Sequence, residues 1–334
     1  MKRLCLLLAL LLALPACGAA GPAGSAEPPG SAETAAGTET AGSMEPAGSA
    51  EPAGGTVAFT DDLGREFALE PPRRVAALIG SFADVWCLAG GRDALVAAAG
   101  DAWTSFDLGL REDTADLGAV KEPSLELLLA AEPDLILASV NTAADLELRE
   151  TFDRAGIPAA YFEVDCFGDY LRMLEVCARL TGRPERYKAY GEDVREQVEA
   201  AVARQDGSAP RVLYVRASGS SCKAKGSEGS VLGEMLADLG CVNIADGGGL
   251  LENLSIEGII AGDPDYIFAV LQGADASAAR KSLDAALLSN PAWSGLRAVR
   301  EGRFITLDHR LYNLKPNARW GEAYEGLADI LYPN

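Results

Sequence analysis

Two cationic clusters stand out in this acidic chain because their residue types could bind an anion. One is Lys223-Ala224-Lys225, and the other runs from Arg310 through Lys315 to Arg319. Arginine and lysine bind carboxylates through charge-assisted hydrogen bonds, and aromatic rings beside them add stacking surface. The formal net charge of the whole chain is −20, which argues against nucleic acid as a partner because phosphate binding needs clustered cations.

The sequence contains none of three common catalytic motifs. It has no Gly-x-Ser-x-Gly nucleophile turn, no Gly-x-x-x-x-Gly-Lys phosphate loop and no Gly-x-Gly-x-x-Gly dinucleotide loop. His309 is the only histidine, which rules out a zinc site that needs two or three imidazoles. A Ser–His–Asp triad could use only this residue, and no serine is marked as its partner. We therefore expect no enzyme, no catalytic residue, no metal site and no resident cofactor.

Two stretches offset by 131 positions repeat one helix–turn–strand pattern. Both 124–138 and 255–269 begin with a serine that can cap a helix, continue with apolar residues at helical spacing and reach a Pro-Asp pair. Proline ends the helix because it has no N–H to donate, and the apolar run after it is typical of a buried strand. Each predicted helix projects one glutamate, Glu126 or Glu257, so the chain has two matched acidic points.

Predicted strands and helices alternate in both halves of the chain, which is typical of α/β folds with mainly parallel sheets. A β-hairpin over 56–69 turns at Asp61-Asp62-Leu63-Gly64, and an amphipathic helix of about 20 residues covers 185–204. Asn317 is expected to cap the terminal helix. We predict two α/β lobes with mainly parallel sheets, at 55–183 and 207–334, joined by a single long helix at 184–206.

The first 54 residues have the composition of an export signal and a tether. A Met-Lys-Arg start precedes an apolar run over 4–14 that is too short for a stable membrane span. The run closes with Leu14-Pro15-Ala16-Cys17-Gly18, which resembles the lipobox of bacterial lipoproteins. The resemblance implies a signal peptide at 1–16 and a lipid on Cys17; the alternative is an ordinary secretory signal. Residues 17–54 would then form a lipidated, disordered tether.

The folded part resembles the class III substrate-binding proteins of ABC importers. The resemblance is carried by Asp61-Asp62-Leu63-Gly64-Arg65, the two helix–Pro-Asp–strand units, the bridging helix, Asn290-Pro291-Ala292-Trp293 and Gly302-Arg303. It implies an extracytoplasmic protein, held at the cell membrane by its lipid alone, that delivers a ligand to an ABC permease and its ATPase. It also implies that Glu126 and Glu257 pair with arginines on the permease.

Ligands of α/β proteins bind beyond the carboxyl ends of the strands, and in two-lobed proteins they bind between the lobes. The loops expected at these ends supply the ligand-binding candidates, which are Ser81, Trp103, Asn141, Cys166, Arg216, Lys223, Lys225, Gln272, His309, Arg310, Tyr312, Lys315 and Arg319. Plain alternatives are a core position for Trp103, a solvated loop for Lys223 and Lys225, and a helix-face charge for Arg319. His309 would either coordinate haem iron or corrin cobalt, or cap a turn.

The sequence does not choose among the ligands that the resemblance implies. An iron–siderophore leads because such chelates are often anionic, and haem or cobalamin is the alternative in the same role. In each case the ligand itself would carry the iron or cobalt. A surface lipoprotein that acts as an enzyme or a sensor without a transporter is the alternative of another class.

Overall fold

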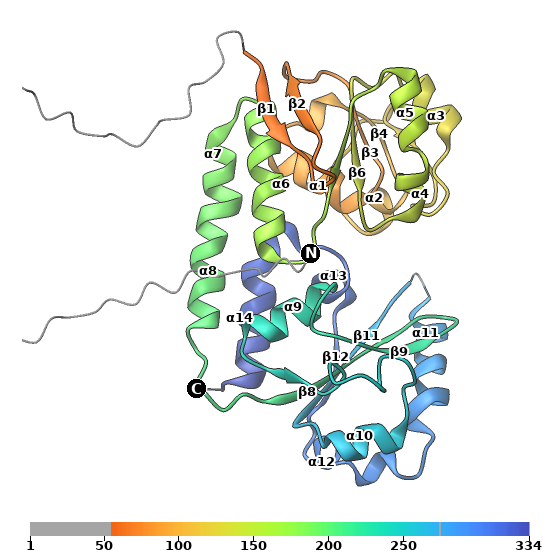
Figure 1. The fold of residues 1–334 in the computed structure, drawn as a ribbon, viewed down its shortest axis with the longest axis vertical. Helices are drawn as coiled ribbons and strands as arrows, with labels where there is room; N and C mark the ends of the chain where they lie inside the picture. Colours follow the sequence, from red (N-terminus) through yellow and green to blue (C-terminus); the bar gives the residue numbers. More distant parts are fainter. Residues whose placement is uncertain (1–54, 274, 334) are drawn as a thin grey trace, which may run out of the picture. The chain divides into compact units, whose positions relative to one another are not determined.

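The computed structural model describes residues 55–273 and 275–333 (Figure 1). The predicted signal peptide, Cys17 and the tether lie outside the described residues. Among the helices in the described part of the chain, none has both the length and the apolar composition needed to cross a bilayer.

The first sheet has five parallel strands in the order β5-β4-β3-β6-β7. Its central strands are short apolar runs that are buried throughout, as expected for a sheet covered on both faces. The strands of the hairpin and of this sheet are β1 (Val57–Thr60), β2 (Glu66–Leu69), β3 (Val75–Ala77), β4 (Leu95–Ala98), β5 (Ala115–Asp116), β6 (Leu135–Ser139) and β7 (Ala159–Phe162). The helices are α1 (Gly80–Leu88), α2 (Asp101–Thr104), α3 (Leu125–Ala130), α4 (Ala143–Glu147), α5 (Arg149–Ala155) and α6 (Phe167–Leu180).

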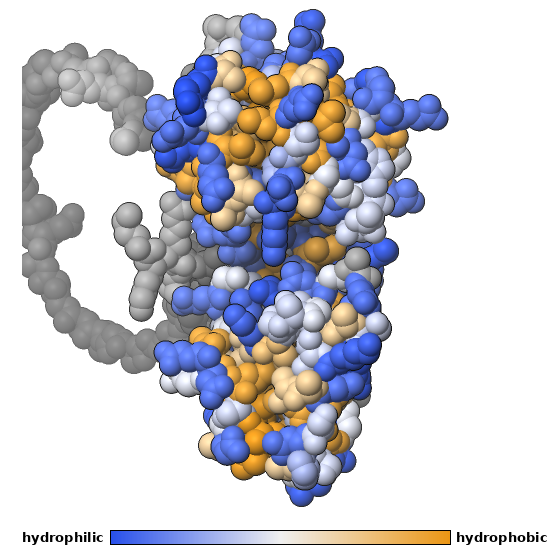
Figure 2. All heavy atoms as spheres, turned by 90° about the vertical axis from the view of Figure 1, so that its right-hand side faces the viewer, coloured by the Kyte–Doolittle hydropathy of each residue, from blue (hydrophilic) through white to orange (hydrophobic). Residues whose placement is uncertain are grey.

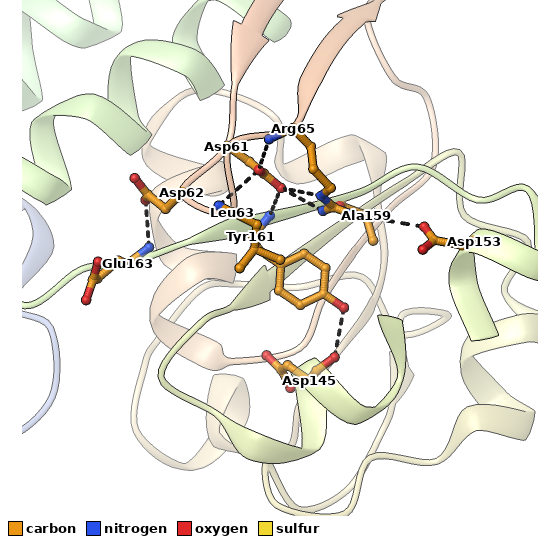
Figure 3. Close-up of polar contacts among 9 residues, drawn as sticks. All are labelled: Asp61, Asp62, Leu63, Arg65, Asp145, Asp153, Ala159, Tyr161 and Glu163. Atoms are coloured by element: carbon orange, nitrogen blue, oxygen red, sulfur yellow. Dashed lines mark hydrogen bonds and ion pairs between the residues drawn. The ribbon is translucent and has the colours of Figure 1, made fainter. Parts of the chain in front are cut away.

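The turn of the β1–β2 hairpin attaches to the edge strand β7 (Figure 3). The side chain of Asp61 is fully buried, and its carboxylate accepts the backbone N–H groups of Leu63, Arg65 and Tyr161 at 3.1, 2.9 and 3.2 Å. The Arg65 guanidinium donates two hydrogen bonds back to Asp61 and one to the carbonyl of Ala159, and it lies 4.9 Å from the ring centroid of Tyr161. The predicted hairpin is confirmed, and its turn covers backbone groups that an edge strand would otherwise expose.

The second sheet has the parallel order β10-β8-β11-β12, and β9 pairs antiparallel with β8. Its strands are β8 (Arg211–Ala217), β9 (Cys222–Lys225), β10 (Val242–Asn243), β11 (Tyr266–Leu271) and β12 (Phe304–Leu307). Its helical segments are α9 (Val231–Asp238), α10 (Ile256–Gly262), α11 (Ala276–Leu283), the π-helical η3 (Asp284–Leu288), η4 (Trp293–Gly295), α12 (Arg297–Arg300) and α13 (His309–Tyr312).

One helical segment connects the two sheets, consisting of α7 (Pro184–Tyr187), the π-helical η2 (Lys188–Glu192) and α8 (Asp193–Val202). The π-helical stretch is a feature that the sequence pattern did not predict. The C-terminal helix α14 (Trp320–Leu331) packs along α8 (Figure 1). The prediction of an α/β fold, with two lobes of mainly parallel sheet joined by a long helix, is confirmed. We call the part built on the first sheet the N-terminal lobe and the part built on the second sheet the C-terminal lobe.

Asn317 is not the helix cap that the sequence predicts. It lies in the short helix η5 (Asn317–Arg319), and α14 begins only at Trp320. Its buried side-chain amide donates to the carbonyl oxygen of Ser81 at 2.9 Å and to the carboxylate of Asp84 at 2.8 Å. Both partners lie on α1, so the asparagine links the C-terminal segment to the N-terminal lobe.

The repeated pattern folds into two matching units, α3–β6 and α10–β11. Ser124 Oγ accepts the N–H of Leu127 at 3.3 Å, and Ser255 Oγ accepts the N–H of Gly258 at 3.1 Å, so both predicted caps are confirmed. Each helix ends before its proline through an acidic residue in the left-handed region, where Glu132 has φ 45° and Asp263 has φ 37°.

Candidate ligand-binding site

A pocket of about 800 Å³ opens at the carboxyl ends of β8 and β11, beside β9. This is the edge where α/β sheets bind ligands. Its lining is mostly polar and comprises Arg216, Ser218, Ser221, Lys223, Ala224, Lys225, Gly226, Ser227, Glu228, Asp246, Leu251 and Gln272. Figure 2 shows one face of the molecule, where a hollow at mid-height is bordered largely by hydrophilic residues.

Three cations of this pocket come from two neighbouring strands. Arg216 on β8 is the direct cross-strand partner of Lys223 on β9, and Lys225 follows on the same strand. Arg216 donates a 3.4 Å hydrogen bond to Asn313, but none of the three cations forms an ion pair with a carboxylate of the described residues. Burial lowers the pKa of Lys225, and the charges of Arg216 and Lys223 lower it further. Like charges on opposed residues destabilise a sheet, so a bound anion would relieve this repulsion.

A second pocket of about 270 Å³ is lined by both lobes. The N-terminal lobe contributes residues of α1 and of the loop after α2, and the C-terminal lobe contributes the segment from Arg310 to Arg319. Lys315 in that segment is a fourth cation, with a side chain that is 15% exposed. Burial lowers its pKa, and the charge of Arg216 contributes to the lowering. The two pockets therefore share one region of positive charge.

The sequence profile of periplasmic binding proteins matches residues 75–311 of this chain. The chain belongs to the periplasmic binding protein family. Members of this family bind and hand over a ligand, which confirms the expectation that the chain is not an enzyme. A search of curated proteins finds no significant match.

Solved structures of periplasmic binding proteins share the fold of this chain. The periplasmic heme-binding protein RhuT from Roseiflexus sp. RS-1, in apo form, is 23% identical with a TM-score of 0.63, and the match covers 78% of this chain and 98% of that one. SirA from Staphylococcus aureus, complexed with staphyloferrin B, is 22% identical with a TM-score of 0.61 and coverages of 83% and 97%. PiuA from Streptococcus pneumoniae is 19% identical with a TM-score of 0.65 and coverages of 82% and 97%. At these identities the likeness establishes the fold and leaves the ligand open.

This periplasmic binding protein brings together several of the residues that the sequence singled out. Gln272 lines the first pocket with Arg216, Lys223 and Lys225, while Arg310, Lys315 and Arg319 line the second. Arg319 is also bound by both carboxylate oxygens of Glu322 at 2.7 Å. Lys223 and Lys225 lie on a strand and not in the solvated loop considered as their alternative.

The other predicted residues line neither of these two pockets. Ser81, Cys166 and Tyr312 are buried, and the Tyr312 hydroxyl donates to the carbonyl of Ala323 inside the core. Trp103 is 40% exposed, so it is not the core aromatic considered as its alternative. His309 opens α13 next to its cap residue Asp308. Within the described ranges, no cluster of three or more His, Cys, Asp or Glu side chains is arranged to hold a metal ion.

Sequence reasoning missed the serines and the acidic residues of the site. Ser218, Ser221, Ser227, Glu228 and Asp246 line the first pocket, and Asp165, which is not a lining residue of either pocket, lies 3.9 Å from Lys315. Asp165 follows β7 and immediately precedes the candidate Cys166. The position of that loop at a carboxyl strand end was the available signal, but an anionic ligand is not expected to bind a carboxylate, so the sequence argument did not select this acid.

Glu126 and Glu257 lie on α3 and α10, one in each repeated unit, and both are exposed. Neither carboxylate has a hydrogen bond or ion pair with another described side chain. Three residues after each glutamate stands an exposed aliphatic residue, Leu129 at 39% and Ile260 at 51%. Residues three apart share one helix face, so each lobe presents an acid beside an apolar side chain.

Proposed function

We propose that this protein is the substrate-binding component of an ABC importer and that it captures an anionic iron chelate of the siderophore type. The observation that carries the proposal is the direct pairing of Arg216 with Lys223 in a pocket where neither has a carboxylate partner among the described residues. Two opposed cations without counter-ions favour a ligand that brings negative charge. The pocket volume of about 800 Å³ is within the range of small-molecule sites.

The same pocket favours a chelate over haem. Structures with this fold include both a heme-binding protein and a staphyloferrin B complex, so the fold alone does not decide. Haem is usually held by an axial His, Met, Cys or Tyr ligand. None of the described lining residues of the first pocket is of these types, and none is aromatic. Haem or cobalamin remains the second candidate, and it is an outcome of the test below.

The proposed test is a tryptophan-fluorescence titration of the full-length chain purified in detergent. Ferric citrate and ferric catecholate complexes, which are anionic, are expected to bind with Kd below about 10 μM. An uncharged ferric hydroxamate is expected to bind at least about tenfold more weakly, and Arg216→Ala should remove this preference. Saturable binding of haem or cobalamin alone would replace the siderophore assignment, and binding of none of the panel would overturn it.

We also propose that the protein is an extracytoplasmic lipoprotein. The support is the cationic start, the apolar run over 4–14 and the Leu-Pro-Ala-Cys-Gly sequence at 14–18. A lipid on Cys17 would hold the protein at the membrane without a spanning helix. Growth with radiolabelled palmitate should label the wild type and leave Cys17→Ala unlabelled; label on the variant would refute the assignment.

We propose further that Glu126 and Glu257 dock the protein onto its permease. The support is their matched position in the repeated units and their exposure without a partner among the described side chains. Leu129 and Ile260 would add an apolar contact beside each acid. Exposed ion pairs contribute little affinity singly, so such contacts would mainly set the register of docking.

A further inference from the structure

Asp165 is held in place between β7 and α6. The Asp169 carboxylate accepts the backbone N–H groups of Asp165 and Cys166 at 3.0 and 3.1 Å, which fixes the backbone there. The Asp165 carboxylate itself accepts a 3.0 Å hydrogen bond from the Asn141 side chain, from the loop after β6. Its orientation is therefore set by two elements of the N-terminal lobe, at the carboxyl end of the sheet.

Lys315 meets this carboxylate from the other lobe. Its Nζ lies 3.9 Å from Asp165 Oδ1, which is within ion-pair range but beyond hydrogen-bond range. The Lys315 ammonium has no hydrogen bond with any described residue, although its side chain is only 15% exposed. A charge-assisted hydrogen bond is stronger than an ion pair at 3.9 Å, so a ligand anion that reaches hydrogen-bond distance would bind the Lys315 ammonium better than Asp165 does.

The charges in this region do not balance. In addition to burial, the positive charge of Arg216 lowers the pKa of Lys315 and of Lys225, and the negative charge of Asp165 acts on both lysines in the opposite direction. Asp165 is the only carboxylate among the described residues that forms an ion pair with one of these cations. It stands where the N-terminal lobe faces the positive charge of the C-terminal lobe, which is the place an anionic ligand would take.

We propose that Asp165 is an internal competitor that occupies Lys315 until an anionic ligand displaces it. The inference rests on the proposed anionic ligand. The negative charge of Asp165 lowers the affinity of the site for every anion that binds Lys315. It also excludes ligands whose own negative charge is too small to displace the Asp165 carboxylate. It is thus a specificity-determining residue and not a ligand contact.

The test is a double-mutant cycle on the full-length chain, with ferric citrate and iron-free citrate as probes. Asp165→Asn keeps the shape and the acceptor for Asn141 but removes the charge, and it should tighten ferric citrate binding by about three- to tenfold. Lys315→Met should weaken binding by at least about tenfold. In the double variant the gain from Asp165→Asn should vanish, because no ammonium remains to be released.

A matched control changes the net charge by the same amount at a position outside the site. Glu199 is exposed on α8 and has no ion pair within the described ranges, so Glu199→Gln should leave both affinities unchanged. Melting curves of each variant check that it is folded. The competitor proposal is overturned if folded Asp165→Asn binds ferric citrate no more tightly than the wild type does. It is also overturned if the gain in affinity from Asp165→Asn persists in the Lys315→Met background.

The outcomes separate this inference from the function on which it rests. If the wild type and Asp165→Asn bind ferric citrate equally, the competitor proposal is rejected and the iron-chelate proposal is retained. If Asp165→Asn binds iron-free citrate more tightly only when Lys315 is present, and no variant binds an iron complex, the competitor proposal is supported and the iron-chelate proposal is rejected.

Discussion

Asp134 and Arg74 form two hydrogen bonds with each other, one through the Asp134 carboxylate and one between their backbones. The Asp134 carboxylate accepts the N–H of Arg74 at 2.9 Å, and the N–H of Asp134 donates to the carbonyl of Arg74 at 2.8 Å. The second repeated unit has the same relationship, because Asp265 and Arg211 exchange these two hydrogen bonds at 2.8 and 2.7 Å. The Pro-Asp pair therefore does more than end a helix: its aspartate sets where the next strand joins the sheet.

The arginines complete this arrangement from their side chains. The Arg74 guanidinium donates to the carbonyl oxygens of Ala131 and Glu132, and the Arg211 guanidinium donates to the carbonyl of Gly262. These carbonyls belong to the ends of α3 and α10, where the backbone has no helical N–H to pair with. A cation at a helix C-terminus is also favourable to the helix dipole.

Removing the aspartate from this exchange is expected to destabilise the fold modestly. Asp134→Ala loses an acceptor for two backbone N–H groups, those of Arg73 and Arg74, and should cost about 1–2 kcal/mol of unfolding free energy. Asp134→Asn keeps one acceptor oxygen and should cost about half as much. Urea unfolding measures both, and an unchanged midpoint for Asp134→Ala would show that the exchange contributes nothing.

Asp61, the buried acid of the hairpin turn, should contribute more to the unfolding free energy than Asp134 does. Asp61→Ala leaves three backbone N–H groups and the Arg65 guanidinium without their acceptor, so a loss of about 3 kcal/mol is expected. The matched control is Asp153→Ala, because Asp153 also pairs with Arg65 but is 62% exposed at 3.8 Å. That variant should lose less than about 1 kcal/mol. Similar losses for the two variants would contradict the importance of burial here.

Stability should also depend on pH through Asp145, which is fully buried in the N-terminal lobe. Burial raises its pKa from 3.8 to about 7, and the nearby Asp101 contributes to the rise. The folded state binds this proton more tightly than the unfolded state does. The resulting stability is therefore fully present below about pH 4 and is lost as the pH rises through about 7.

Asp145→Asn is expected to remove this pH dependence. Asparagine can still accept the N–H of Ser139, the hydrogen bond that Asp145 makes at 2.7 Å. Between pH 4 and 8 the wild type should lose on the order of 3 kcal/mol more unfolding free energy than the variant. Urea midpoints at both pH values provide the measurement, and parallel pH profiles for the two proteins would sink the prediction.

The docking proposal predicts a split between binding and transport. Glu126→Ala with Glu257→Ala should leave the ligand Kd unchanged, because neither glutamate is a lining residue of the first or the second pocket. Uptake of the ferric ligand by cells that carry the complete importer should fall by at least about tenfold. Unchanged uptake in this double variant would end the docking role.

The aliphatic neighbours allow an independent check of the same surface. Leu129→Ser with Ile260→Ser should reduce uptake without changing ligand affinity or net charge. The control pair Glu196→Ala with Glu199→Ala removes two exposed charges from α8 and should leave uptake intact. A loss of uptake in the control would indicate a general charge effect and not a docking contact.

The sequence by itself determined the features that depend on neighbours along the chain. The capping serines at 124 and 255, the Pro-Asp turns and the hairpin turn at 61–64 are decided within a few residues, so local chemistry was sufficient to predict them. Alternating apolar runs determined the α/β class for the same reason. The glutamates of α3 and α10 followed from the repeat.

Only the tertiary structure decided how distant residues meet. The antiparallel return of β9 places Lys223 opposite Arg216, and a shift of one residue would have put these side chains on opposite faces. Lys315 reaches Asp165 across 150 positions, and Asn317 reaches α1 across more than 230. Such contacts depend on strand register and on how the lobes pack, which no local pattern encodes. The duplicated helices could therefore be predicted from the sequence, whereas the balance of charge in the ligand site could not.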